Sequence, residues 1–403
     1  MGLIYKNGIL HFGEAHLTPL DVLCKQNHEA FYLYDLDGMR TRVAALRAAV
    51  PGIQIHYAMK ANTSLRILQV FQKEGTGVDV VSGGEIRTAL KAGFVAGDVI
   101  FSGVGKTRQE LELAIGLGIK QLNVESPQEL SRIIEIARAL KKKPRVAFRM
   151  NPDVDAKTHP YITTGFRENK FGMGEHFVPE LIQLLKAAPD AVEPVGLTMH
   201  IGSQLQDILP IEDAIRITLQ VWEQFTSAGI QLRSLDVGGG LGIPYHEAHT
   251  VPSRDLALLS GYGAMLKRAL ASFRGDVLCE PGRILVGSCG TLLGEVQYVK
   301  ETPDRTFLIL NTGMHHLIRP ALYQAHHRIM AVNEGGALRK YDVVGPICES
   351  SDVLGKDREL PETKQGDWFA IADAGAYGFA MASTYNEHEK PKQYYLEGGK
   401  VSE

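Results

Sequence analysis

The chain is organised around the stretch Ile53-Gln54-Ile55-His56-Tyr57-Ala58-Met59-Lys60-Ala61-Asn62-Thr63. Apolar and polar residues alternate from Ile53 to Tyr57, which predicts a buried strand, and Asn62-Thr63-Ser64 is typical of a helix N-cap. The strand therefore delivers Lys60 to its C-terminal end. A single lysine is most often a solvated surface charge. At the end of an apolar strand, burial lowers the pKa of the amine and frees it for Schiff-base chemistry.

Short apolar runs recur along the first three quarters of the chain, separated by amphipathic stretches. Glu129 to Lys141 is the clearest amphipathic stretch, with Leu130, Ile133, Ile134, Ala137 and Leu140 on one helical face. Eight strands that alternate with helices favour a closed (β/α)8 barrel, a TIM-like fold. An open doubly wound sheet is the alternative; the barrel is preferred because polar residues follow nearly every strand rather than one switch point. The predicted strands are Ile53–Met59, Val78–Val81, Val99–Phe101, Gln121–Val124, Arg145–Met150, Gly196–Ile201, Leu235–Val237 and Val277–Cys279.

After Val286 the predicted strands follow one another without long helices between them, which indicates a β-sandwich or β-barrel domain. These strands are Gly287–Lys300, Thr306–Leu310, Tyr341–Val344, Trp368–Ala372 and Gln393–Leu396. A hairpin around the turn Asn7-Gly8 cannot bury itself alone and is expected to join this domain. We therefore predict a barrel over residues 29–286, and a β domain over residues 1–28 plus 287–403.

Composition excludes several function classes. The 403 residues are 44% hydrophobic and 22% charged, as in ordinary globular proteins, and the net charge of -3 gives no reason to expect nucleic acid or an anionic membrane as a partner. No apolar run approaches the roughly 18 residues of a membrane span, and Met1 to Glu14 lacks the pattern of a signal peptide. Cys24, Cys279, Cys289 and Cys348 are scattered without metal-type spacing, which predicts no metal site and a reducing, cytoplasmic setting.

Polar groups converge where the predicted barrel strands end, which is where barrel enzymes carry their chemistry. Lys60, Asp79 and Arg149 end the first, second and fifth strands. The last three strands end in His200-Ile201-Gly202-Ser203-Gln204, Asp236-Val237-Gly238-Gly239-Gly240-Leu241-Gly242 and Glu280-Pro281-Gly282-Arg283. A strand-end histidine is often structural, and a glycine cluster often marks only a tight turn. Together, however, these segments describe an anion site, because successive glycines expose backbone N–H groups and Arg283 and Ser203 can add donors.

The glycine cluster fits neither common nucleotide motif. A dinucleotide fingerprint that begins at Gly238 and Gly240 requires glycine at position 243, which is Ile243, and the Lys-Ser/Thr ending of an NTPase loop is absent. A phosphate-bearing cofactor that also needs a Schiff-base lysine is pyridoxal phosphate. Its pyridinium nitrogen needs an acidic partner, for which Glu280 is the candidate.

These segments, together with two later ones, resemble the diaminopimelate decarboxylases, which form part of the alanine racemase/ornithine decarboxylase-like (fold type III) pyridoxal-phosphate family. The resemblance runs in order from about residue 30 to residue 391. The motifs that carry it are Tyr57-Ala58-Met59-Lys60-Ala61-Asn62, His200-Ile201-Gly202-Ser203-Gln204, Gly238-Gly239-Gly240, Glu280-Pro281-Gly282-Arg283, Cys348-Glu349-Ser350 and Asp373-Ala374-Gly375-Ala376-Tyr377-Gly378.

The resemblance implies a role for each cofactor-site residue. Lys60 forms the Schiff base, His200 stacks on the ring, and Glu280 pairs with the pyridinium. Asp79, Glu85 and Arg149 orient these groups. The phosphate is held by Ser203, Gly238, Gly239, Gly240, Pro281, Gly282 and Arg283, and Tyr377 closes over it.

The resemblance also implies the substrate. A segment like Leu317–Tyr323 binds its far end, where Arg283, Arg319, Tyr323 and Tyr377 offer donors to a distal carboxylate. Cys348-Glu349 comes from the second subunit of a homodimer, with Cys348 as proton donor and Glu349 for a distal ammonium. The implied reaction converts meso-2,6-diaminopimelate to L-lysine and CO2, the final step of lysine biosynthesis. One segment departs from the family: Glu387-His388-Glu389 follows Tyr385-Asn386 where relatives more often have a Ser/Thr-Arg-Pro run.

Two alternatives remain at this stage. The first is a decarboxylase of the same fold that acts on ornithine, arginine or a carrier-bound glutamyl group. The second is a non-catalytic pyridoxal-phosphate-binding or regulatory protein. The presence of Cys348 in addition to Lys60 argues against the second alternative, since simple cofactor binding needs no proton donor.

Overall fold

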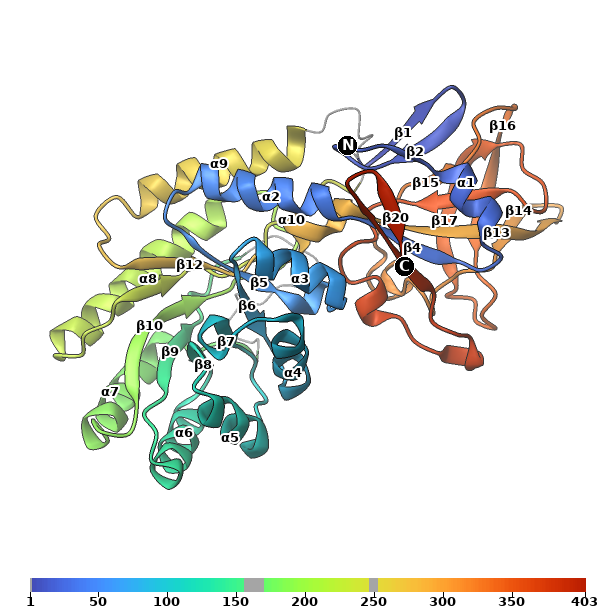
Figure 1. The fold of residues 1–403 in the computed structure, drawn as a ribbon. Helices are drawn as coiled ribbons and strands as arrows, with labels where there is room; N and C mark the ends of the chain where they lie inside the picture. Colours follow the sequence, from blue (N-terminus) through green and yellow to red (C-terminus); the bar gives the residue numbers. More distant parts are fainter. Residues whose placement is uncertain (1, 156–169, 246–252) are drawn as a thin grey trace. The chain divides into compact units, whose positions relative to one another are not determined.

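The computed structural model describes residues 2–155, 170–245 and 253–403, which form two compact units (Figure 1). The barrel unit comprises Ala44–Gly242 and Ala257–Gly282, and the β unit comprises Met1–Val43, Ile243–Leu256 and Arg283–Glu403.

These boundaries differ from the predicted 29–286 and 1–28 plus 287–403. Strand β4 (Phe31–Asp35) pairs with β13 (Gly290–Glu301) and with β19 (Lys392–Glu397), so it belongs to the β unit rather than to the barrel.

The barrel unit is a closed ring of eight parallel strands in the order β10-β11-β12-β5-β6-β7-β8-β9, which confirms the predicted fold class. The strands are β5 (Gln54–Ala58), β6 (Gly77–Val80), β7 (Val99–Phe101), β8 (Gln121–Val124), β9 (Arg145–Met150), β10 (Glu193–Met199), β11 (Ser234–Asp236) and β12 (Asp276–Cys279). The register pairs Ala58 with Asp79 and Thr198 with Asp236, so the ends of neighbouring strands lie level. Polar residues at these ends are therefore brought together.

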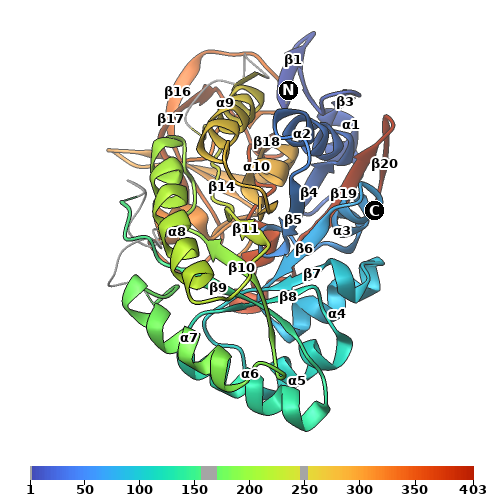
Figure 2. The same cartoon turned by 90° about the vertical axis from the view of Figure 1, so that its left-hand side faces the viewer.

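Helices cover the outside of the ring, as Figures 1 and 2 show for α4 to α8. Local signals set their ends: Thr107 and Glu110 form a capping box at the start of α5, and Gly93 and Gly118 end α4 and α5 in the left-handed region. The barrel helices are α3 (Leu65–Lys73), α4 (Gly83–Ala92), α5 (Arg108–Leu117), α6 (Pro127–Leu140), α7 (Val178–Ala187), α8 (Leu209–Ser227) and α9 (Ser253–Ala269).

Helix α6 buries most of its predicted apolar face, with one correction. Leu130, Ile133, Ile134 and Ala137 are buried, whereas Leu140 is 41% exposed. Leu140 is the last residue of the helix, and Lys141 follows it in the left-handed conformation that ends the helix. The apolar face therefore stops one turn earlier than its spacing suggests.

The β unit is built around β13, which pairs with β4 on one side and with β14 (Thr306–Leu310) on the other. The main path of its nine-stranded sheet runs β17-β16-β14-β13-β4-β19-β20, and β18 joins β15 to β13. The remaining strands are β15 (Ile329–Ala331), β16 (Leu338–Val344), β17 (Val353–Pro361), β18 (Trp368–Ile371) and β20 (Lys400–Ser402). Sequence patterns missed β17, in which charged residues interrupt the apolar alternation.

The N-terminal hairpin, β1 (Leu3–Lys6) with β2 (Ile9–Phe12), packs into the core of the β unit. Leu10 and Phe12 lie in one buried cluster with Leu33 of β4 and Leu293 of β13. The hairpin thus buries its apolar face against strands that are distant in sequence.

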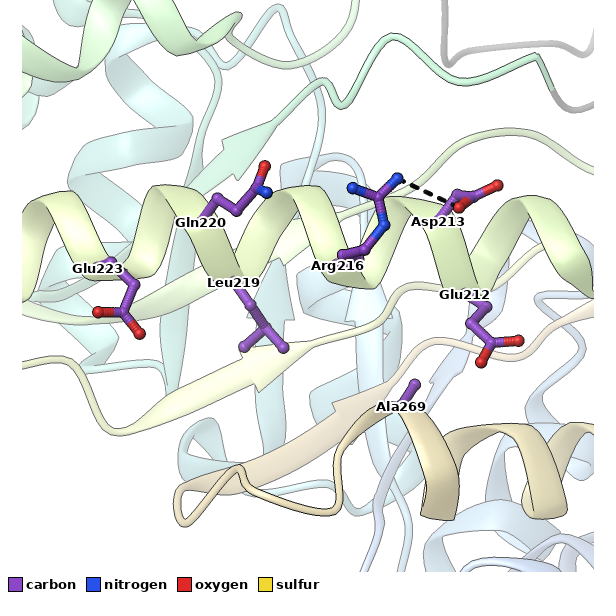
Figure 3. A pocket seen from close by; sticks show the side chains of 7 residues that line it. All are labelled: Glu212, Asp213, Arg216, Leu219, Gln220, Glu223 and Ala269. Atoms are coloured by element: carbon purple, nitrogen blue, oxygen red, sulfur yellow. Dashed lines mark hydrogen bonds and ion pairs between the residues drawn. The ribbon is translucent and has the colours of Figure 1, made fainter.

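No helix in the described ranges is both long enough and apolar enough to cross a membrane. A surface pocket lies along α8, where Glu212, Asp213, Arg216 and Glu223 line it with Ala269 of α9 (Figure 3). Arg216 is paired with Asp213 at 3.3 Å, and none of the predicted site residues lines this pocket. It is a solvated helix face, and the chemistry has to be sought at the strand ends.

Candidate active site

Lys60 lies in a single turn, Met59–Ala61, directly after β5. Its Nζ donates to Asp79 Oδ2 at 2.6 Å, across the register that pairs Ala58 with Asp79. The Lys60 side chain is 34% exposed, whereas Asp79 is fully buried. A buried carboxylate thus fixes the direction of an amine that solvent and ligands can still reach.

Glu85 and His200 lie close enough to Lys60 for its charge to affect their pKa values. Burial is the main cause that raises the pKa of Glu85 to about 6, while the backbone N–H of Val81, at 2.8 Å, and the charge of Lys60 oppose the rise. Burial, followed by the charges of Arg149 and Lys60, holds the pKa of His200 well below its usual value. The His200 ring is therefore neutral at pH 7, which suits stacking on an aromatic ring.

The tautomer of His200 follows from its neighbour. The backbone N–H of Gly239 donates to His200 Nδ1 at 3.3 Å, so the ring proton of the neutral imidazole is on Nε2. The glycine cluster thus orients the histidine as well as offering donors of its own.

Glu280 follows β12 and is held by polar side chains from two other strand ends. Its Oε1 accepts from Asn123 Nδ2 at 3.2 Å and from Ser102 Oγ at 3.4 Å. Gln121 Nε2 donates to Asn123 Oδ1 at 2.7 Å and fixes that amide. Ser102 and Asn123 were not predicted as site residues from the sequence; the available signal was a buried strand, Gln121–Val124, with two amide side chains in it.

Glu280 and Asp236 form a buried pair of carboxyl groups. Burial raises the pKa of Glu280 well above its usual value, and the negative charges of Asp236 and Asp79 raise it further. Burial raises the pKa of Asp236 to about 7, although Gly238 N–H, 2.9 Å from Asp236 Oδ1, and a hydrogen bond with Glu280 oppose the rise. Two carboxylates at this depth cannot both be charged without a cation, so the cofactor-free pair holds a proton.

This pair predicts a pH-dependent stability of the cofactor-free protein. A pKa raised from the usual 3.8 to about 7 stabilises the fold fully below about pH 4, and the stabilisation is lost as pH rises through 7. Asp236→Asn keeps an oxygen for Gly238 and removes this titration. We expect its unfolding midpoint to fall less between pH 5 and pH 8 than that of the unchanged protein. Parallel pH profiles from thermal melts would contradict the assignment.

The three glycines of the cluster permit the loops after β10, β11 and β12 to touch. A Cβ on Gly238 would lie 2.1 Å from Met199 O, one on Gly239 would lie 2.1 Å from Glu280 O, and one on Gly240 would lie 2.3 Å from Gly202 O. Gly238 and Gly240 also have φ of +70° and +102°. The backbones of these loops therefore pack more closely than any side chain at the three positions would permit.

The barrel residues fit pyridoxal phosphate. The site presents an amine held by a buried carboxylate, a neutral imidazole, a buried carboxyl pair and a glycine cradle beside Ser203. Arg149 is fixed nearby, because its Nη1 contacts Glu125 Oε1 at 2.7 Å and both side chains are nearly buried. The amine, ring partner and acidic partner that the cofactor requires are all present in one unit.

Four of the predicted phosphate and substrate residues interact in the β unit. Arg283 begins α10 (Arg283–Val286), and its guanidinium lies 4.8 Å from the ring centre of Tyr377. Arg319 begins α11 (Arg319–Tyr323). Burial is the main cause that lowers the pKa of Arg319, Tyr245 opposes this, and the charge of Arg283 lowers it further. Tyr323 acts on Arg283 electrostatically. The predicted residues thus form one cationic cluster with aromatic walls.

Tyr245 completes this cluster and was missed by the sequence analysis. Its hydroxyl accepts from Arg283 Nη1 at 2.7 Å, and its ring centre lies 4.5 Å from the Arg319 guanidinium. Arg319 Nη1 also donates to His327 Nε2 at 2.8 Å, while His327 Nδ1 donates to Ala372 O at 2.8 Å. The available signal was position, since Tyr245 follows the glycine cluster by a few residues.

Cys348 and Glu349 lie in the loop between β16 and β17 and contact Tyr385 and Asn386, which directly precede the segment that departs from the family. Tyr385 OH donates to Glu349 Oε1, which together with Ser351 holds the pKa of Glu349 below its usual value. Cys348 N–H donates to Asn386 Oδ1 at 3.5 Å, and the Cys348 side chain is exposed. The loop thus presents a thiol and a charged carboxylate at the surface of its own unit.

The departing residues are anchored by histidines. The His388 ring lies 4.7 Å from the ring of His315, which lies 3.7 Å from that of His316. His316 Nε2 donates to Glu389 O at 2.9 Å. His388 and Glu389 therefore pack against His315 and His316. Tyr385 and Asn386, which precede them, contact the loop that carries Cys348 and Glu349.

Known proteins resemble this chain over nearly its whole length. The model of the pyridoxal-binding domain of pyridoxal-dependent decarboxylases matches residues 36–287. A diaminopimelate decarboxylase of Helicobacter pylori is 42% identical over 381 residues, which is 93% of this chain and 92% of that protein. The diaminopimelate decarboxylase of Aquifex aeolicus is 39% identical over 98% of this chain and 94% of its own length.

Solved structures give the same picture. The crystal structure of diaminopimelate decarboxylase from Helicobacter pylori, complexed with L-lysine, superposes with a TM-score of 0.88 at 41% identity, covering 95% of each chain. The viral arginine decarboxylase of Paramecium bursaria Chlorella virus reaches a TM-score of 0.84 at 20% identity, which shows a shared fold only.

Proposed function

The chain belongs to the diaminopimelate decarboxylases, a family of pyridoxal-dependent decarboxylases, and on this premise we propose how its residues convert meso-2,6-diaminopimelate to L-lysine and CO2. Pyridoxal phosphate, when bound, supplies the electron sink that accepts the charge left by departing CO2. Lys60 would hold it covalently, and His200 would lie against its ring. Ser203, the glycine cluster and Arg283 would hold its phosphate. Glu280 would face its ring nitrogen, where a positive charge allows the buried carboxyl to ionise.

Asp79 has a positioning role in this scheme. At 2.6 Å from Lys60 Nζ, Asp79 Oδ2 fixes where the nitrogen lies. Asp79 would also hold the Lys60 amine within the site whenever Lys60 is not bonded to the cofactor. Glu85, with its pKa raised to about 6, is a second group that can hold a proton there.

Cys348 is the proposed proton donor to the carbon that loses CO2, and it acts across a homodimer. The thiol is exposed on its own subunit, and Glu349 beside it is fixed by Tyr385 and Ser351. These features support the proposal that this loop contributes to the active site of the neighbouring subunit. The four cysteines are thiols rather than disulfides, which fits our proposal of a cytoplasmic enzyme.

Arg319 carries the proposed substrate assignment. It is 5% exposed, and no carboxylate among the described residues lies within ion-pair distance of its guanidinium. A desolvated cation without an anion is costly, so the position favours a ligand that brings a carboxylate. Diaminopimelate keeps a carboxylate at its far end after the reacting one is placed, whereas ornithine and lysine present only an ammonium there.

Arg319→Ala tests this assignment. Loss of one charge-assisted pair in a desolvated site should cost about 2–4 kcal/mol, or roughly 30- to 1,000-fold in kcat/KM for diaminopimelate. Cofactor absorbance should be unchanged. CO2 release is measured with diaminopimelate, lysine, ornithine and arginine. Arg339→Ala, which removes an exposed arginine paired with Glu301 in the same unit, is the control.

Two results would reject the substrate assignment. One is an unchanged enzyme that prefers ornithine, arginine or lysine to diaminopimelate. The other is an Arg319→Ala enzyme that turns over diaminopimelate as fast as the Arg339→Ala control.

A further inference from the structure

Tyr245 lies between two arginines; its ring is closer to Arg319, and the ring centre also lies 5.8 Å from the Arg283 guanidinium. The hydroxyl oxygen accepts from Arg283 Nη1 at 2.7 Å, and the ring centre lies 4.5 Å from the Arg319 guanidinium carbon. Tyr245 is 5% exposed. A single buried side chain therefore fixes the positions of both cations.

The two guanidinium groups need such a fixture because they repel each other. Arg283 lowers the pKa of Arg319, after burial, and the attraction of Tyr245 opposes both. The electron-rich face of a tyrosine ring stabilises a desolvated cation, and the phenol oxygen accepts a charge-assisted hydrogen bond. His327 is a neutral acceptor for Arg319, so it adds direction without adding negative charge.

Tyr245 is itself held from two sides. His326 Nδ1 donates to the Tyr245 backbone oxygen at 3.1 Å, and the His327 ring packs edge-on against the tyrosine ring at 5.2 Å. A ring fixed in this way limits the positions open to Arg319. Less freedom is then lost when a carboxylate binds, which raises affinity for that ligand alone.

We propose that Tyr245 is a positioning residue that determines specificity: its ring mainly presents Arg319 to the distal carboxylate of the substrate, while its hydroxyl is the main contact that holds Arg283. The inference rests on the proposed function of Arg319. It divides one side chain into two roles, which different substitutions can separate.

Tyr245→Phe keeps the ring and removes the hydroxyl, and Tyr245→Leu removes both. L-lysine and cadaverine serve as competitive probes, because they differ by the single carboxylate that is at issue. Tyr245→Leu should raise the inhibition constant of L-lysine about 5- to 30-fold and that of cadaverine less than about 2-fold. Tyr245→Phe should leave the ratio of the two constants unchanged and weaken binding of pyridoxal phosphate, followed by its visible absorbance in a titration.

Tyr341→Phe is the matched control. Tyr341 is a buried tyrosine of the same unit whose hydroxyl accepts from Thr363 N–H at 3.2 Å and whose ring lies 5.9 Å from the exposed Arg339. Like Tyr245→Phe, Tyr341→Phe removes a tyrosine hydroxyl from the β unit. It should change neither the ratio of the inhibition constants of L-lysine and cadaverine nor the binding of pyridoxal phosphate.

The outcomes separate this inference from the proposal beneath it. If Arg319→Ala abolishes the preference for L-lysine over cadaverine while Tyr245→Leu keeps it, the positioning role is wrong and the role of Arg319 stands. If Arg319→Ala also keeps the preference, both are wrong. Should Tyr245→Leu fail to fold, Tyr245→Phe decides: wild-type cofactor affinity or a shifted ratio would overturn the division of roles.

Discussion

Lys60→Ala protein is expected to lose at least about 10³-fold in decarboxylation rate, because the residue supplies the only amine proposed to hold the cofactor covalently. The structure adds a second reason: removing the Lys60 ammonium leaves Asp79, which is fully buried, without the cation 2.6 Å away. The loss of the Lys60 charge also removes one of the causes that lower the pKa of Glu280 and Asp236.

The measurement combines turnover with covalent labelling. Borohydride reduction of unchanged protein should attach the cofactor to the peptide that contains Lys60, and the Lys60→Ala protein should acquire no label. Lys73→Ala, an exposed lysine in the last turn of the neighbouring helix α3, should behave like the unchanged protein. Label on another lysine in the unchanged protein would show that the strand-end amine has a different role.

The barrel could be predicted because its information is local. Each buried parallel strand is a short apolar run, and several are followed by helices with side-chain N-caps, such as Ser82 at α4 and Thr107 at α5. Lys60, Asp79, His200 and Glu280 share the property that each ends a strand, so correct strand positions were enough to group them.

The features that the sequence did not predict depend on contacts between residues far apart in the chain. Strand β4 has the same apolar character as a barrel strand, and only its pairing with β13 and β19 shows that it belongs to the β unit. Periodicity carries no such information. Ser102 and Asn123 escaped notice for a related reason: a polar residue in a strand shows its purpose only when its partner, here Glu280, is known.

The homodimer proposal makes the second large prediction. Cys348→Ala protein should lose about 10²- to 10⁴-fold in decarboxylation rate, which is the usual contribution of a positioned proton donor. Its cofactor absorbance and its borohydride label on Lys60 should be unchanged, because Cys348 lies in the loop between β16 and β17 and is not proposed to hold the cofactor.

Mixing the two inactive proteins tests whether the thiol acts in the neighbouring site. Random reassociation of equal amounts of Lys60→Ala and Cys348→Ala proteins makes about half of all dimers mixed. If Cys348 serves the partner's Lys60, one of the two sites in each mixed dimer has both residues, so about a quarter of the unchanged activity should return. The double variant Lys60→Ala/Cys348→Ala, mixed with unchanged protein, is the control, since every mixed dimer then lacks an intact site. If mixed dimers are shown to form and no activity returns, Cys348 works within its own subunit or takes no part in proton transfer.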